Sequence, residues 1–214
     1  MDCVEIGYSE QCFQDLPPCG DGMISRHSDG VLRVMLADGI GHGRSANDAI
    51  VLLQQQFDWF WNRSQTVGGM SECMQEMHAC LRSASGFNQA AAALVEINRN
   101  TEIITALCIG NVKAHLVGED RFVSFPCLNG MLGGHMPGSL LISVEQLKEW
   151  SLLVLHSDGV STSSLRAYLQ SLPASRPGLS GQAQHLATQI IQNFGKTTDD
   201  ASCTVVVLNQ RGLA

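Results

Sequence analysis

Four acidic sites in this chain share one local pattern, in which a carboxylate lies where an apolar segment meets a polar turn. Asp21 occurs in CGDG, Asp38 in LADGIGHG, Asp158 in LHSDGVS and Asp199 in TTDDASCTVVV. The segments before Asp38 and Asp158 are apolar enough to form buried strands, and a further apolar segment follows Asp199. One Asp-Gly pair is more often a turn than a ligand. The repeated position at strand ends nevertheless predicts that the carboxylates converge at one end of a layered fold.

Carboxylates that converge need a counter-charge. Two of them roughly 4 Å apart repel by about 4 kcal/mol at an effective dielectric constant of about 20, so they either bind protons or hold cations. Oxygen ligands without supporting Cys or His favour the hard ions Mg²⁺ and Mn²⁺ over zinc. Gly39 follows Asp38 directly, and its unhindered backbone would let its carbonyl join the ligands.

The composition excludes several other classes of protein. The chain has 214 residues, of which 44% are hydrophobic and 15% charged, and its formal net charge is −7. A nucleic-acid-binding face needs clustered Lys and Arg, so we expect no nucleic acid partner. The eight cysteines form no C-x-x-C pair that would suggest zinc. The sequence starts with neither a basic leader nor an apolar signal segment, so we expect one cytoplasmic domain over residues 1–214, monomeric and without a membrane segment.

Apolar spacing predicts three helices and several short strands. Apolar residues recur at three- and four-residue steps in 43–61, 70–84 and 183–194, which is the helical period. Strand-like segments are paired around turns, and Ser28-Asp29-Gly30 between two of them is a strong hairpin signal. The segments are 22–27, 31–37, 89–97, 102–110, 112–118, 121–125, 151–157 and 202–209. Consecutive hairpins predict two packed antiparallel sheets covered by helices on their outer faces, an α+β fold.

In this order the motifs resemble the metal-dependent Ser/Thr protein phosphatases of the PPM (PP2C-like) family, in their bacterial sporulation and stress-response branch. That branch has Gly-Asp near the N-terminus, D-G-[MI]-G-H-G before a helix, a strand ending in S/T-D-G, and D-D-x-[ST] before the last strand. The matching residues here are Gly20-Asp21, Asp38-Gly39-Ile40-Gly41-His42-Gly43, Ser157-Asp158-Gly159 and Asp199-Asp200-Ala201-Ser202. The resemblance implies an α-β-β-α sandwich with a two-metal site, for Mn²⁺ or Mg²⁺, between the sheets.

The resemblance also implies a role for each acidic residue. Asp38 would bridge the two ions, with the carbonyl of Gly39 on one of them. Asp158 and Asp199 would hold the other ion, and Asp21 would lie on or beside the ion that Gly39 contacts. Asp200 would support these ligands without binding a metal.

Two features of the resemblance concern residues around the metals. Eukaryotic members have His directly after Asp-Gly, whereas Ile40 stands there in this chain and His42 follows two residues later. We therefore expect His42 to pack or hydrogen-bond locally rather than to protonate the leaving group. Arg26 and Arg44 are the nearest candidates for the phosphate-binding Arg of eukaryotic members, and Gly110-Asn111 resembles the family's mid-sheet turn.

The implied function is a metal-dependent protein phosphatase that hydrolyses phospho-Ser/Thr with a metal-activated water. The chain is similar in length to small free-standing feedback phosphatases, which implies phosphorylated STAS-domain proteins of the stressosome as substrates. Two other interpretations stay open: a catalytically inactive PPM-like binding module, and a GHKL-type ATP-binding kinase. The kinase's D-x-G-x-G box requires Gly where Ile40 stands, so the kinase is the weaker alternative.

Overall fold

Two β-sheets form the centre of the protein, seen in a computed structural model that describes residues 5–63, 69–86, 88–172, 179 and 181–208. The first sheet has the order β1-β11-β10-β6-β7 and the second β2-β3-β4-β5-β8, with β9 also pairing with β5. In chain order the strands are β1 (Glu5–Gln11), β2 (Asp21–Ser28), β3 (Val31–Gly39), β4 (Ala90–Asn98), β5 (Ile103–Ile109), β6 (Lys113–Val117), β7 (Phe122–Ser124), β8 (Cys127–Leu128), β9 (Ser143–Gln146), β10 (Leu152–His156) and β11 (Ala201–Val207).

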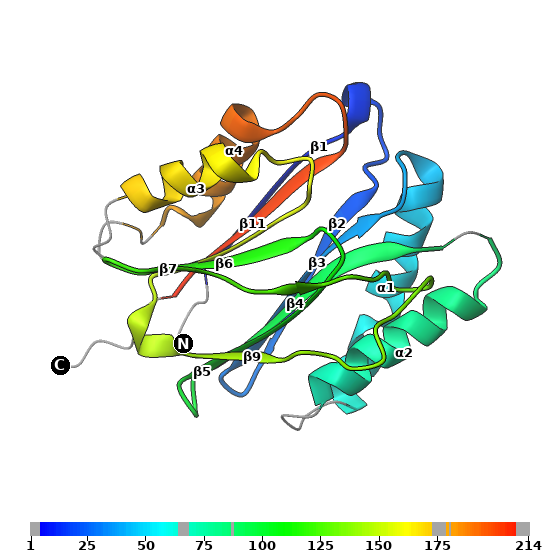
Figure 1. Cartoon of the computed structure of the whole chain (residues 1–214), viewed down its shortest axis with the longest axis horizontal. Coiled ribbons are helices and arrows are strands. Elements are labelled where there is room, and N and C mark those ends of the chain that lie inside the picture. Colours follow the sequence, from blue (N-terminus) through cyan, green and yellow to red (C-terminus); the bar gives the residue numbers. More distant parts are fainter. Residues whose placement is uncertain (1–4, 64–68, 87, 173–178, 180, 209–214) are drawn as a thin grey trace.

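Helices cover the outer face of each sheet. Figure 1 shows α1 (Arg44–Arg63) and α2 (Gly69–Ser83) on one side of the strands, with α3 (Thr162–Ser171) and α4 (Ala183–Phe194) on the other. Two short 3₁₀ turns, η1 (Phe13–Asp15) and η2 (Leu147–Glu149), lie in the connections. No helix in the part of the chain that the structure describes is both long and apolar enough to cross a bilayer.

Three apolar cores hold these four layers together, and strand alternation explains them. In β3, Val34 and Leu36 face the other sheet, whereas Met35 and Ala37 face α1 and α2. Successive side chains of a strand point to opposite faces, so a strand buried on both sides is apolar throughout. A third core lies between the first sheet and the helices α3 and α4. The predicted α-β-β-α sandwich is therefore confirmed.

The predicted elements agree with the structure where their periodicity is strong. The three predicted helices are α1, α2 and α4, and the hairpin around Ser28-Asp29-Gly30 joins β2 to β3. Asp29 and Gly30 both have positive φ, 51° and 78°, as the two central residues of a type I′ turn require.

Besides the two 3₁₀ turns, three strands and one α-helix were not predicted. β1 lies at the edge of its sheet, and its half-buried polar residues hide the alternation of a strand. α3 begins in a run of Ser and Thr, which favours turns over helices. β8 and β9 are two and four residues long, too short to show a period.

Candidate metal centre

Three predicted ligands that are far apart in the sequence line one open cleft. The cleft has a volume of about 670 Å³, and Asp38, Asp158 and Asp199 all contribute to its wall. Asp38 is the penultimate residue of β3, Asp158 follows the end of β10, and Asp199 precedes β11. The ends of strands from both sheets therefore bring these carboxylates together, as the pattern of acidic sites predicts.

Asp21 lies next to Asp38, because the two residues are directly opposite in the β2–β3 ladder. Its side chain is 3% exposed, and neither carboxylate oxygen has a hydrogen-bond partner among the described residues. Burial raises the pKa of Asp21 to about 6, although the nearby hydroxyls of Ser157 and Ser202 act in the opposite direction. A buried carboxylate without a partner is costly unless a cation neutralises it.

The carboxylates influence one another electrostatically. Burial, followed by the charges of Asp21, Asp158 and Asp199, raises the pKa of Asp38 to about 9. The pKa of Asp199 is also raised, by burial first and then by Asp158 and Asp200, against the backbone N–H of Asp200 and the charge of Lys196. Four carboxylates in one such environment fit hard divalent cations, which prefer oxygen ligands.

The backbone at Gly39 comes close to the first turn of α1. A Cβ on Gly39 would lie 2.3 Å from the carbonyl oxygen of Ala46, so only glycine fits. The N–H of Gly39 donates to the carbonyl of Gly20, and the N–H of Ile40 donates to the carbonyl of Gln89, both at 2.9 Å. These contacts hold the end of β3 against its neighbours, beside the cleft.

Asp200 and His42 lie around the cleft in different ways. Asp200 is buried, and its two oxygens accept the N–H of Phe13 at 2.7 Å and that of Gly20 at 2.9 Å. It thus contacts the segment that precedes Asp21 and does not line the cleft. His42 lines the cleft, and its ring lies 4.5 Å from that of Phe13.

Comparison of the sequence with known families supports the predicted family. A sequence model described as stage II sporulation protein E (SpoIIE) matches residues 28–209. The chain belongs to the SpoIIE family. This confirms the resemblance to bacterial PP2C-like phosphatases and the predicted class of enzyme, a phosphoprotein phosphatase.

Similarity to individual proteins and solved structures supports the same family. The phosphoserine phosphatase RsbX of Bacillus subtilis is 24% identical over 154 residues, which cover 71% of this chain and 72% of RsbX. A crystal structure of RsbX with magnesium matches with a TM-score of 0.75, at 16% identity, over 97% of this chain and all of that one. A chain from a study of the bacterial stressosome, described as a modular system, has a TM-score of 0.77 at 24% identity, covering 96% of this chain and all of the other. The PP2C domain of SpoIIE from B. subtilis has a TM-score of 0.73 at 18% identity, over 96% of this chain and 63% of that one.

Two polar residues of this SpoIIE-family chain contact Asp158 and were not predicted to do so. The side-chain amide of Asn111 donates to Oδ2 of Asp158 at 2.6 Å, and Nζ of Lys196 donates to its backbone carbonyl. Asn111 follows Gly110, which has a φ of 85° in the turn after β5. The resemblance identified this turn as a family feature. No local sequence pattern, however, indicates that the side-chain amide of Asn111 contacts Asp158, 47 positions away.

The two Arg residues considered for phosphate binding have different positions. Arg26 forms an ion pair with Asp58 of α1 and does not line the cleft, so the structure does not support a phosphate-binding role for it. Arg44 is exposed at the first residue of α1 and is also absent from the cleft wall. Lys196 does not line the cleft either, but its charge acts on Asp199 and its ammonium contacts the backbone carbonyl of Asp158.

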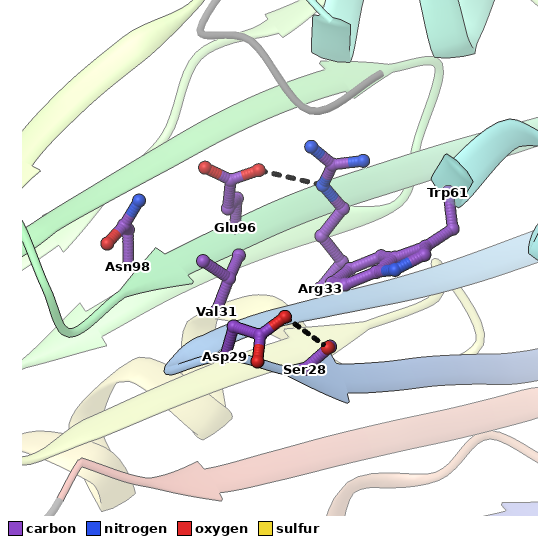
Figure 2. A pocket seen from close by; sticks show the side chains of 7 residues that line it. All are labelled: Ser28, Asp29, Val31, Arg33, Trp61, Glu96 and Asn98. Atoms are coloured by element: carbon purple, nitrogen blue, oxygen red, sulfur yellow. Dashed lines mark hydrogen bonds and ion pairs between the residues drawn. The ribbon is translucent and has the colours of Figure 1, made fainter. Parts of the chain in front are cut away.

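A smaller pocket of about 110 Å³ lies away from this centre (Figure 2). Arg33 is 4% exposed, pairs with Glu96 through Nε at 2.7 Å and lies over the ring of Trp61. The pocket contains none of the predicted site residues. Its opposite charges, Arg33 and Glu96, pair with each other.

Gly159→Ala is expected to destabilise the fold by about 3 kcal/mol, a large value for overpacking. The added Cβ would lie 1.9 Å from the carbonyl oxygen of Asp200 and 2.8 Å from Cα of Ala201. Both contacts are with backbone, so no side chain can move aside. Urea unfolding followed by circular dichroism measures the change. Gly138→Ala is the control, because a Cβ there has nothing within 4 Å, and equal stability of the two variants would contradict the prediction.

Proposed function

We propose that this protein is a metal-dependent phosphatase that hydrolyses phospho-Ser/Thr on a bacterial stress-signalling protein. The observation that carries the proposal is the convergence of Asp38, Asp158 and Asp199 on one cleft, with Asp21 opposite Asp38. Family membership supports the reaction class, and RsbX, a relative, is named a phosphoserine phosphatase. The GHKL-type kinase has no support from these findings.

Each acidic residue has a proposed role in holding two divalent cations, Mn²⁺ or Mg²⁺. Asp38 would hold both ions, the carbonyl of Gly39 would hold one of them, and Asp158 and Asp199 would hold the other. Asp21, whose oxygens have no hydrogen-bond partner among the described residues, would lie on or beside the ion held by Gly39. When bound, such a pair of ions supplies a water activated for in-line attack on phosphorus and neutralises the phosphoryl oxygens.

The remaining residues orient these ligands. Asp200 is tied to the backbone of Phe13 and Gly20 and keeps the segment before Asp21 in place. Asn111 orients the carboxylate of Asp158, and the ammonium of Lys196 is placed to attract the substrate phosphate. No Ser or Cys nucleophile is needed, so no cysteine of the chain has to be reactive.

We propose phosphorylated STAS-domain proteins of the stressosome as the substrate class. The support is the similarity to RsbX and to a chain from a bacterial stressosome, together with a cleft open enough for a phosphorylated side chain. All seven cysteines that the structure describes are free thiols, which fits the reducing cytoplasm as the location. We expect the protein to act as a monomer.

The proposal is tested by hydrolysis of p-nitrophenyl phosphate with Mn²⁺ and with EDTA. A phosphatase shows a rate that requires the metal, whereas an inactive binding module shows none. Phosphorylated STAS-domain proteins are then incubated with the enzyme and Mn²⁺, and phosphate release is followed separately for Ser and Thr. Turnover of the small ester without turnover of these proteins would retain the reaction and reject the substrate class.

Asn111→Ala is expected to weaken metal binding, and the Mn²⁺ concentration for half-maximal activity should rise by about tenfold or more. Groups that orient a ligand from outside the metal's coordination sphere typically contribute this much. The measurement is a manganese titration of the phosphatase rate. Asn193→Ala, on the exposed surface of α4, is the control and should leave the titration unchanged. An unchanged titration for Asn111→Ala would show that the amide does not orient Asp158.

A further inference from the structure

A second cavity lies beside Asp21 and outside the cleft. It has a volume of about 270 Å³ and is bordered by the end of β1, the segment that follows it and the first half of α1. Glu10, Cys12 and Cys19 all border this cavity. One ligand atom from each of these three residues lies within 4.8 Å of the other two. The proposed dimetal centre uses none of them.

The chain brings the two thiols together by a tight reversal. β1 ends at Gln11, Cys12 precedes η1, and the segment then returns so that the buried Cys19 lies beside Cys12. Backbone N–H groups of Asp15 and Leu16 donate to the carbonyls of Cys12 and Phe13, which forms the 3₁₀ turn η1 at the start of the reversal. The two sulfurs are thus held near each other by the backbone.

The third donor is oriented by a neighbour. The hydroxyl of Tyr8 donates to Oε2 of Glu10 at 2.5 Å. Carboxylates that bind metals are commonly held in this way by a hydrogen bond from outside the coordination sphere. The carboxylate of Glu10 is therefore turned by Tyr8, two residues away on the same face of β1.

We propose that Glu10, Cys12 and Cys19 form a binding site for a thiophilic divalent cation, with Zn²⁺ the best match. Two thiolates and one carboxylate select zinc over the hard ions of the cleft. In a tetrahedral site with bonds of about 2.3 Å, neighbouring sulfurs are about 3.8 Å apart, which the present separation of the donors reaches with small side-chain rotations. Water from the open cavity completes the coordination.

The site has a structural consequence for the cleft. Cys12 directly precedes Phe13 and Cys19 directly precedes Gly20, and the backbone N–H groups of Phe13 and Gly20 hold Asp200. A cation on Cys12 and Cys19 closes this segment at both ends. We therefore expect zinc to slow amide hydrogen exchange at Phe13 and Gly20, which mass spectrometry of the corresponding peptides measures.

The site is tested on the full chain, reduced with a phosphine and kept in excess Mg²⁺ so that the carboxylate cleft does not compete for zinc. Zn²⁺ titration by calorimetry should give one more bound ion for the wild type than for Cys12→Ser. Co²⁺ in place of Zn²⁺ should give a thiolate-to-cobalt charge-transfer band that Cys12→Ser lacks. Tyr8→Phe should retain the site and weaken zinc binding by about tenfold or more.

Cys127→Ser is the matched control. Cys127 is also a half-buried thiol beside a buried one, Cys108, its register partner in the β5–β8 pair. The control should bind zinc and cobalt like the wild type, and thermal unfolding should show that each variant is folded. The proposal is overturned if Cys12→Ser binds as much zinc as the wild type, if the cobalt band is absent, or if the band disappears in Cys127→Ser instead. These readouts do not depend on phosphatase activity, so the two proposals fail separately.

Discussion

Asp38→Asn is expected to lower the Mn²⁺-dependent phosphatase rate by about 10³-fold or more, while the metal-free protein becomes more stable. Bridged cations contribute several kcal/mol to the transition state, and each 1.36 kcal/mol corresponds to about a factor of ten. The same carboxylate is buried near the charges of Asp21, Asp158 and Asp199. Replacing it by a neutral amide of the same shape removes that repulsion.

Two measurements decide the result, the rate of p-nitrophenyl phosphate hydrolysis with Mn²⁺ and the melting temperature in EDTA. Asp29→Asn is the control, since Asp29 lies in the β2–β3 turn, away from the cleft. Asn tolerates the positive φ of this position, so the control should retain both activity and stability. A variant at Asp38 that is fully active, or that melts lower in EDTA, would contradict a role in metal binding.

Relative to Asp38→Asn, the metal-free wild type is expected to lose stability as the pH rises from about 6.5 to 9, by up to about 1.4 kcal/mol per pH unit. The pKa of Asp38 is raised from 3.8 to about 9 in the folded state. A raised pKa means that the fold binds this proton more tightly than the unfolded chain does. The stabilising contribution of this proton is therefore complete below about pH 4, and it is lost as the pH rises through the folded-state pKa of Asp38. Divalent cations should cancel the loss, because they replace the proton.

Other titrating groups also change the stability near this pH range, so the effect of Asp38 is measured against Asp38→Asn. Burial lowers the pKa values of His115 and His156 to about 3 and 4, so these residues reduce stability only below about pH 6.5. The pKa of Cys127 is lowered to about 7, first of all by its hydrogen bond with Cys108, which acts in the opposite direction to Asp38. Urea unfolding in EDTA and in Mg²⁺ measures the loss. The difference in unfolding free energy between wild type and Asp38→Asn gives the contribution of Asp38. Equal slopes of the unfolding free energy against pH for the two proteins would refute the explanation.

The parts of the structure that sequence reasoning could predict are those with a local cause. The apolar period identifies α1 and α4, and the Ser28-Asp29-Gly30 turn requires the positive φ values that Asp29 and Gly30 adopt. The order of the acidic motifs indicated that Asp38, Asp158 and Asp199 would lie together, and all three line the cleft. Their roles as ligands stay predictions.

Contacts between distant segments were not predictable. The amide of Asn111 reaches Asp158 only because β6 and β10 are neighbours in the first sheet. The spacing of the cysteines does not indicate a zinc site, because a C-x-x-C pattern identifies only ligands that are three residues apart. Cys12 and Cys19 are brought together by a longer reversal. A search by spacing misses such a pair.

The place of β11 in its sheet has a consequence for how the protein is made. β11 lies between β1 and β10 and pairs with both along its length. Among the strands that the structure describes, β11 is the last to be synthesised, so β1 has no partner in its sheet until residue 207 has been added. The first sheet therefore cannot be completed before β11 has been made, and no activity is expected from a nascent chain that lacks this strand. Ribosome-bound chains that stop before residue 201 should expose the edges of β1 and β10, where chaperones bind.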